Sequence, residues 1–296
     1  MLTRWTPDPP TIALVVVLVV AYVAGVRRYA EGDTRWPRSR HMAFGAGVGL
    51  IALMGLSFFG AYADTLFWVR AAQVITLLMV VPLCLALSSP VALALSVWPG
   101  LRRVLATRAL RVLTFPATAS VLLIATPWLL YFTGWYPAVL ENTVVDHLSR
   151  LALLLVGFLY FYSRLQLDPV PHKYPHLISV VITFVEVIFD AALGLVLWLS
   201  PHIVAEGYYQ ALGRTWGPSL RTDQIVGAGV LWIVGDLAGL PFLGALMHRM
   251  SHDDAAEAAV IDRQLDEAET STTDGPSRMW WEDDPVLSER FRRGRG

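Results

Sequence analysis

The residues of this chain that could do chemistry are ionisable side chains inside long apolar runs, namely Arg70, Arg150, Glu186, Asp190 and Asp236. A charge within a hydrocarbon layer is costly, so such residues usually face the interior of a helix bundle and pair with one another. Three uses fit this pattern. The charges can fix helix packing, form a proton or ion path, or form a substrate or metal site.

Spacing places the three carboxylates close to one another. Glu186 precedes Asp190 by four residues, so both project from one face of a helix. At about 1.5 Å of rise per residue, Asp190 and Asp236 lie roughly 15 Å below the same membrane boundary. We therefore expect a carboxylate stripe that faces Arg70 and Arg150.

The two arginines lie at matched depths, each about one helical turn inside the boundary. Arg70 is near the start of one apolar run, and Arg150 follows Asp146 at the start of another. An arginine at this depth can extend to the headgroups or pair inside the bundle. We expect both to point inward and to lie near Asp190 or Asp146.

Histidines are weak candidates for a metal site. Only His147 and His202 fall on the same side of the membrane as Arg70. His172 and His176 have ligand-like spacing, but prolines before each interrupt any helix that would align them, so a solvated loop is the better interpretation. The sequence has no phosphate-binding loop and no nucleophile elbow, so we expect no enzyme and no cofactor.

The elements that position these residues are apolar runs of about 20 residues, the length that spans a hydrocarbon core of about 30 Å. Of the 296 residues, 55% are hydrophobic and 16% are charged. The chain is predicted to be an all-α polytopic membrane protein with seven transmembrane helices. These helices are expected at residues 11–27, 43–62, 66–88, 115–133, 147–163, 177–199 and 225–247.

Basic residues indicate the orientation. They are concentrated in the first, third and fifth connections, which contain Arg27, Arg28, Arg35, Arg38 and Arg40, then Arg102, Arg103, Arg108 and Arg111, then Arg164 and Lys173. Basic connections stay in the cytoplasm. We therefore expect a multi-pass protein of the cytoplasmic (inner) cell membrane, with the N-terminus outside and the C-terminus in the cytoplasm.

Composition divides the chain into three parts. Residues 1–248 are expected to form the transmembrane domain, with Pro90 to Leu101 as an interfacial helix. Residues 249–269 are predicted to be a polar cytoplasmic helix, and residues 270–296 a disordered tail. The net charge of −1 indicates no nucleic-acid partner. The expected partners are the lipid bilayer and another membrane protein.

Between Trp36 and Glu269, an ordered set of short motifs resembles the CtaG-like cytochrome c oxidase assembly factors. The motifs are Tyr208-Tyr209 with Gly213, Trp216-Gly217, Asp223-Gln224, Gly229, Trp232, Gly235-Asp236-Leu237, Asp168-Pro169-Val170-Pro171, and Pro82 with Ser89-Pro90. Gln73, Asp146 and His147 are also family-signature positions. The resemblance implies a bacterial polytopic protein that acts in copper delivery to, or maturation of, a haem-copper respiratory oxidase.

The chain departs from this family pattern where the family carries histidines. The family's His-Met-x-Gln-His segment corresponds to Arg70-Ala71-Ala72-Gln73-Val74, in which only Gln73 remains. Further family histidines align with Arg150, Ala152 and Asp190. A guanidinium has no lone pair for a metal. The resemblance therefore implies fold and partner class more strongly than copper handling, which is doubtful here.

The sequence is interpreted as a non-catalytic assembly or scaffold factor of respiratory oxidase biogenesis. Two alternatives remain at this point. One is a small transporter or proton-linked channel that uses Glu186, Asp190 and Asp236, which predicts an aqueous cavity reaching those carboxylates. The other is a stable accessory subunit of a membrane complex. A scaffold predicts a filled core and an apolar outer groove.

Overall fold

The computed structural model describes residues 5–30, 35–165 and 176–271, and all regular secondary structure in these ranges is helical, as predicted. The chain divides into two compact units, Met1–Ala245 and Leu246–Gly296. The elements are α1 (Pro9–Ala30), α2 (Arg38–Leu56), α3 (Phe58–Tyr62), α4 (Phe67–Ile75), the π-helical η1 (Thr76–Val80), α5 (Val81–Leu87), α6 (Pro90–Val97), α7 (Leu101–Leu105), α8 (Arg108–Leu113), α9 (Pro116–Phe132), α10 (Trp135–Glu141), α11 (Thr143–Leu165), α12 (His176–Leu199), α13 (Glu206–Ala211) and α14 (Leu220–Ser271).

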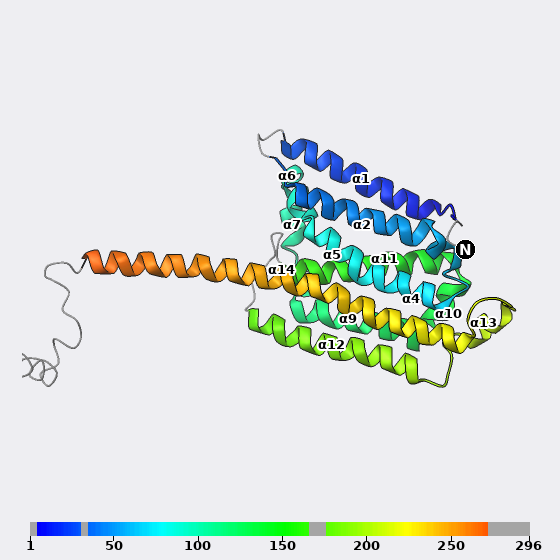
Figure 1. Ribbon diagram of the computed structural model, residues 1–296. Helices are drawn as coiled ribbons and strands as arrows, with labels where there is room; N and C mark the ends of the chain where they lie inside the picture. The colour runs from blue at the N-terminus through cyan, green and yellow to red at the C-terminus, as the bar shows by residue number, and fades with distance from the viewer. Residues whose placement is uncertain (1–4, 31–34, 166–175, 272–296) are drawn as a thin grey trace, which may run out of the picture. The chain divides into compact units, whose positions relative to one another are not determined.

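The first unit is a bundle whose long helices lie side by side (Figure 1). In it α2 packs against α1 and α5, α11 packs against α5 and α9, and α12 packs against α9. The continuous α4–η1–α5 helix forms the centre of the bundle. Its most apolar window is 83% buried, whereas that of α1 is 17% buried. The core is therefore built around residues 67–87, and α1 is a peripheral helix.

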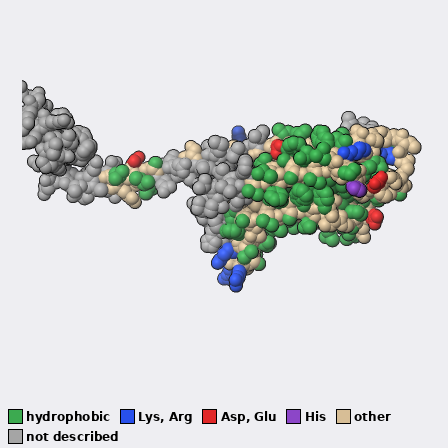
Figure 2. Space-filling view, turned by 90° about the horizontal axis from the view of Figure 1, so that it is seen from below, with side chains coloured by type: hydrophobic (Ala, Val, Ile, Leu, Met, Phe, Trp, Pro, Cys, Tyr) green, Lys and Arg blue, Asp and Glu red, His purple; other side chains and the backbone are tan. Residues whose placement is uncertain are grey.

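Four helical segments are long and apolar enough to cross a membrane in the described part of the chain: residues 9–30, 38–62, 67–87 and 143–165. The pair α9 and α10, bent by 68°, adds a fifth if it is one broken span. Figure 2 shows hydrophobic side chains covering most of one face, with charged side chains toward its ends. The chain is thus a helical membrane protein. The sixth and seventh predicted runs fall in α12 and α14, and the count of seven spans stays a prediction.

The fifth predicted helix begins earlier than the sequence suggested. We expected it at residues 147–163, but α11 begins at Thr143 because the Asn142 side chain accepts hydrogen bonds from the backbone N–H groups of Val144 and Val145. The connection before it contains α10. Asp146 therefore lies in the first turn of a transmembrane helix.

The π-helical segment η1 lies next to Pro82, a family-signature position. Proline has no N–H group to donate to the carbonyl four residues earlier, and its ring clashes with that carbonyl. The carbonyl in question belongs to Leu78, within η1. It lies against Gly157 of α11, where an added Cβ would come within 2.0 Å of the Leu78 oxygen. Pro82 and Gly157 together explain how the central helix and α11 pack so closely.

The polar helix predicted at residues 249–269 lies within α14, which runs to Ser271. The tail at 272–296 lies outside the described residues. The predicted interfacial helix at residues 90–101 is shorter, since α6 ends at Val97 and Leu101 begins α7.

Candidate functional site

A network of buried charges is centred on Asp146, whose side chain is 8% exposed. One oxygen of Asp146, Oδ1, accepts a hydrogen bond from Arg70 Nη1 at 2.6 Å, and Oδ2 forms an ion pair with Arg150 Nη2 at 2.5 Å. Arg70 comes from α4, whereas Arg150 follows Asp146 by one turn of α11. One carboxylate therefore binds two guanidinium groups, and it is one of the two carboxylates that we expected beside them.

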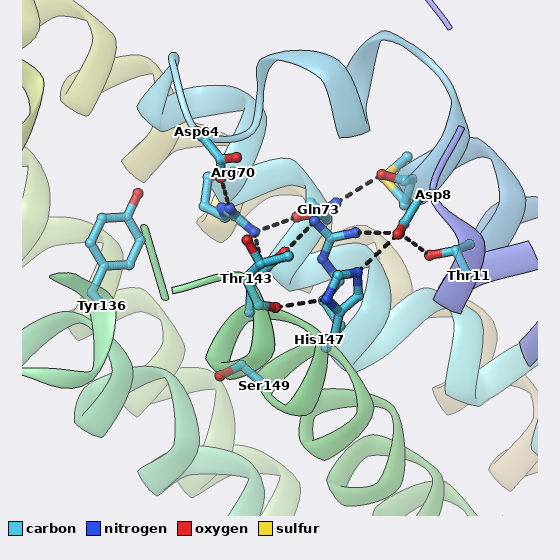
Figure 3. A network of polar contacts seen from close by, with 12 residues as sticks. Asp8, Thr11, Asp64, Arg70, Gln73, Tyr136, Thr143, His147 and Ser149 are labelled. Atoms are coloured by element: carbon cyan, nitrogen blue, oxygen red, sulfur yellow. Dashed lines mark hydrogen bonds and ion pairs between the residues drawn. The ribbon is translucent and has the colours of Figure 1, made fainter. Parts of the chain in front are cut away.

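Arg70 makes two further contacts within the bundle (Figure 3). Its Nη1 donates to Gln73 Oε1 at 2.9 Å, and its Nη2 pairs with Asp64 in the turn before α4. Gln73 Nε2 donates to the backbone carbonyl of Met54 in α2 at 2.8 Å. Arg70 is only 2% exposed. Gln73, the one residue kept from the family's histidine segment, thus connects Arg70 to α2.

Asp8, just before α1, joins the N-terminal segment to α11. It accepts hydrogen bonds from Thr11 Oγ1 at 2.6 Å, His147 Nε2 at 2.9 Å and Arg150 Nη1 at 3.3 Å. Burial raises the pKa of Asp8, but the hydrogen bonds from Thr11 and His147 and the charges of His147 and Arg150 outweigh burial, so the pKa lies below its ordinary value of 3.8. Asp8 is therefore ionised at neutral pH.

His147 contacts an acceptor with each ring nitrogen. Nδ1 lies 2.7 Å from the Thr143 carbonyl oxygen, and Nε2 lies 2.9 Å from the Asp8 carboxylate. A neutral imidazole has one N–H group, so only the charged imidazolium satisfies both contacts. With His147 charged, three cations face the three carboxylates of Asp8, Asp64 and Asp146. With His147 neutral, the cluster carries one excess negative charge.

A second buried cluster lies at the other end of α11. Arg164 Nη1 lies 3.4 Å from Glu186 Oε1 and 3.3 Å from Ser120 Oγ, and Tyr160 OH donates to Glu186 Oε2 at 2.7 Å. The side chains of Arg164 and Glu186 are 0% and 5% exposed.

This second cluster corrects two expectations. Arg164 was placed in a cytoplasmic connection, but α11 continues to Leu165, so Arg164 lies in its last turn. Glu186 was expected to face Arg70 and Arg150, and it pairs with Arg164 instead. Asp190 interacts electrostatically with Glu186 and with Asp236, and the carboxylate stripe stays a prediction.

Two signature residues at the start of α14, Asp223 and Gln224, form hydrogen bonds with backbone groups of other segments. Asp223 accepts hydrogen bonds from the backbone N–H groups of Phe67 at 3.2 Å and Trp68 at 3.0 Å, which caps the N-terminus of α4. Gln224 accepts from the Val204 N–H at 2.8 Å and donates to the Leu197 carbonyl at 3.0 Å. These two positions therefore have a structural explanation.

Three further signature positions, Trp216, Gly217 and Trp232, have local structural explanations. Trp216 stacks edge-on against Tyr62 with centroids 5.7 Å apart, and Gly217 has the positive φ of 79° that favours glycine. On α14, Trp232 packs against Gly194 of α12, where an added Cβ would lie 3.0 Å from the tryptophan Cβ. The Asp168 to Pro171 motif and His172 lie outside the described residues.

The residues present do not fit a copper site. Neither Arg70 nor Arg150 has a lone pair to offer, and both nitrogens of His147 already contact oxygen acceptors. His202 is exposed, and its backbone carbonyl accepts from Gln224 at 3.1 Å. Within the described ranges, no group of three or more His, Cys, Asp or Glu side chains is placed to hold a metal ion.

Sequence reasoning missed several members of the two clusters. Asp8 and Asp64 were not singled out, although Asp64 precedes Arg70 by six residues and is the acidic residue in a short connection. Tyr160, four residues before Arg164, was also missed. Because residues four apart lie on the same face of a helix, the spacing of Tyr160 and Arg164 could have predicted that they lie close together. Nothing in the local sequence links Asp8 to His147, which is 139 residues away.

The fold and the two clusters define a polytopic helical membrane protein whose buried charges are paired across helices. The chain belongs to the cytochrome c oxidase caa3 assembly factor family (Caa3_CtaG), whose model matches residues 20–253. This bears out the resemblance noted in the sequence.

The chain is also similar to curated mycobacterial proteins described as uncharacterized. Relatives from Mycobacterium bovis and Mycobacterium tuberculosis are each 29% identical over 286 residues, which covers 88% of this chain and 43% of the relative. A relative from Mycobacterium leprae is 27% identical, with 89% of this chain and 42% of the relative covered. The chain thus spans less than half the length of these relatives. No solved structure matches the chain.

Proposed function

We propose that this chain is a non-catalytic assembly or scaffold factor of the cell membrane, which binds a haem-copper respiratory oxidase or one of its subunits during assembly. Its membership of the caa3 oxidase assembly factor family carries the proposal. The same membership favours this role over the transporter and channel alternative. Since the chain covers less than half of its curated relatives, any activity of their remaining parts is not assigned to it.

The Asp146 network supports a scaffold role over metal transfer. Arg70 and Arg150 stand where the family resemblance places histidines, and each pairs with Asp146. Buried opposite charges that satisfy one another can occupy the space of a bound cation and its ligands. In this proposal the network holds α1, α4 and α11 in a fixed arrangement, and the protein acts through its surface.

Deletion of the gene in its host tests this proposal. Assembled oxidase, measured by its haem absorption and activity, should fall and should be restored by the wild-type chain. An oxidase subunit should copurify with the tagged protein from native membrane. Because the proposed role is structural, added copper should not rescue the deletion strain. Unchanged oxidase in the deletion strain, together with no copurified subunit, would contradict the proposal.

We further propose seven spans with the N-terminus outside and a cytoplasmic C-terminus. The basic residues of α7 and α8, Arg102, Arg103, Arg108 and Arg111, support this orientation. Arg164 no longer counts toward it, because its side chain is buried in an ion pair. A reporter fused after Gly296 should be active in the cytoplasm. A periplasmic signal would overturn the span count.

A further inference from the structure

A cavity of about 220 Å³ lies between α1, α2, the central helix and α11. α1 packs against α2 and α6, whereas α11 packs against η1, α5 and α9, so space remains between α1 and α11. The contacts of Asp8 with His147 and Arg150 join the two helices where α1 begins. The cavity therefore lies beside a polar contact that links its two walls.

The lining of the cavity is polar at one end and apolar over the rest. Gln73, His147 and Arg150 line the polar end, and Leu14, Leu77 and Leu154 are among the apolar lining residues. Leu154 lies about two helical turns deeper along α11 than His147. This gradient matches a molecule with one polar group and a long apolar part.

The cavity opens to the outer surface of the bundle. Two of its lining residues, Leu148 and Leu151, are themselves 62% and 42% exposed. They lie on α11, a candidate membrane span, so the surface that they share with α1 faces hydrocarbon. The apolar part of the cavity does not hold water, and its walls lose dispersion contacts when nothing fills it. A hydrocarbon chain from the surrounding membrane would restore those contacts.

The charges at the polar end select the kind of head group. Both Nη atoms of Arg150 are used by Asp8 and Asp146, and its buried Nε has no hydrogen-bond partner. The cluster is neutral or carries one excess negative charge, depending on His147, so it offers no net positive charge to an anion. A neutral carbonyl oxygen can lie beside Arg150 without adding an unpaired charge to the cluster.

We propose that this cavity binds one acyl chain of a membrane glycerolipid, with an uncharged ester carbonyl beside Arg150. This site is independent of the assembly role proposed above. The lipid enters between α1 and α11, and its chain packs along Leu14, Leu151 and Leu154.

Photolabelling of the full-length protein in phosphatidylcholine vesicles tests the site. The probe is a phosphatidylcholine that carries a diazirine on one acyl chain, and labelled peptides are located by mass spectrometry. Leu151→Trp should lower labelling of the cavity walls by about fivefold or more, because the indole fills the space. Leu155→Trp, one turn further on the exposed face of α11, is the matched control and should leave that labelling unchanged.

The opposite wall gives an independent check. Leu14→Trp should lower the labelling of the α11 wall by the probe. The control is Val16→Trp, since the Val16 side chain is 52% exposed on α1, and it should leave that labelling unchanged. Equal labelling of all four variants would mean that only surface lipid was labelled and would overturn the proposal. A diazirine fatty acid that labels the cavity more strongly than its methyl ester would overturn the assignment of an uncharged carbonyl.

Discussion

The two ends of α11 hold buried charges in two different ways. In the Asp146 cluster, formed by Asp8, Asp64, Arg70, Asp146, His147 and Arg150, each arginine contacts two carboxylates and Asp146 contacts both arginines. In the Arg164 cluster, formed by Ser120, Tyr160, Arg164 and Glu186, the described contacts centre on the Arg164–Glu186 ion pair, with the hydroxyl groups of Tyr160 and Ser120 beside it. From this comparison we expect that the number of shared partners, as well as burial, decides how much stability is lost when one charge is removed.

The largest effect is expected from Asp146→Ala. It leaves Arg70 and Arg150 without their common partner, and breaking a buried ion pair from one side costs about 3–5 kcal/mol. The free energy of unfolding in mixed detergent micelles measures the loss. Asp64→Ala is the matched control, since Asp64 is 58% exposed and pairs with the same Arg70, and it should cost less than about 1 kcal/mol. Equal losses for the two variants would show that Asp146 has no central role.

A double-mutant cycle on Arg70 and Asp146 sharpens this result. The double change to Ala should cost less than the sum of the singles, because residues in one ion-pair network are coupled by about 0.5–3 kcal/mol. The double variant should still be less stable than wild type, since Arg150 loses the partner that it shares with Arg70. Strictly additive losses would contradict direct coupling.

The Arg164 cluster should tolerate removal of its pair more easily. Glu186→Leu alone should cost about 3 kcal/mol, whereas Arg164→Leu with Glu186→Leu should cost about 1–2 kcal/mol, because a buried pair is often replaceable by apolar residues. The residual loss reflects the Tyr160 hydroxyl, which loses an acceptor. Adding Tyr160→Phe to the double variant should recover part of this residual loss of stability. If the double variant is as unstable as the sum of its singles, the contrast between the clusters fails.

A smaller effect concerns pH at the edge of the Asp146 cluster. Because the pKa of Asp8 is lowered in the folded protein, its contribution to stability is present above the unfolded value near 4 and is lost as pH falls through the folded value. Asp8→Asn should therefore lower the Tm at neutral pH, and its difference from wild type should shrink toward pH 3. We expect this contribution to be about 1 kcal/mol or less. A difference that does not change with pH would exclude this role for Asp8.

The smallest effect is expected from copper. If the Asp146 cluster has replaced a ligand set, adding Cu(I) to the purified protein should change the Tm by no more than about 1 °C. Elemental analysis should then find no stoichiometric copper. One bound copper per chain that is lost in His147→Ala or His202→Ala would show that the cluster is a metal site.

Sequence periodicity and hydropathy were sufficient for the helical membrane class. The inward position of Arg70 and Arg150 was predicted from their matched depth together with the family resemblance, which places histidines at both positions. They were insufficient for helix ends, because a cap such as Asn142 or a buried ion pair such as that of Arg164 extends a helix past its apolar run. They also missed contacts made by packing. Asp8 meets His147 only because α1 and α11 lie beside each other at one end, and no local spacing encodes that contact.

The π-helical turn at Thr76–Val80 fixes the rotational phase of the central helix. A π turn contains about one residue more than an α turn, so the segments before and after it are offset by the angle of one residue, about 100°. Arg70 and Gln73 lie before the turn and Pro82 lies after it. Deleting one residue of the turn would restore a regular helix with Pro82 still against Gly157, but it would rotate Arg70 away from Asp146. The extra residue thus sets two angular positions on one helix, one for packing and one for charge.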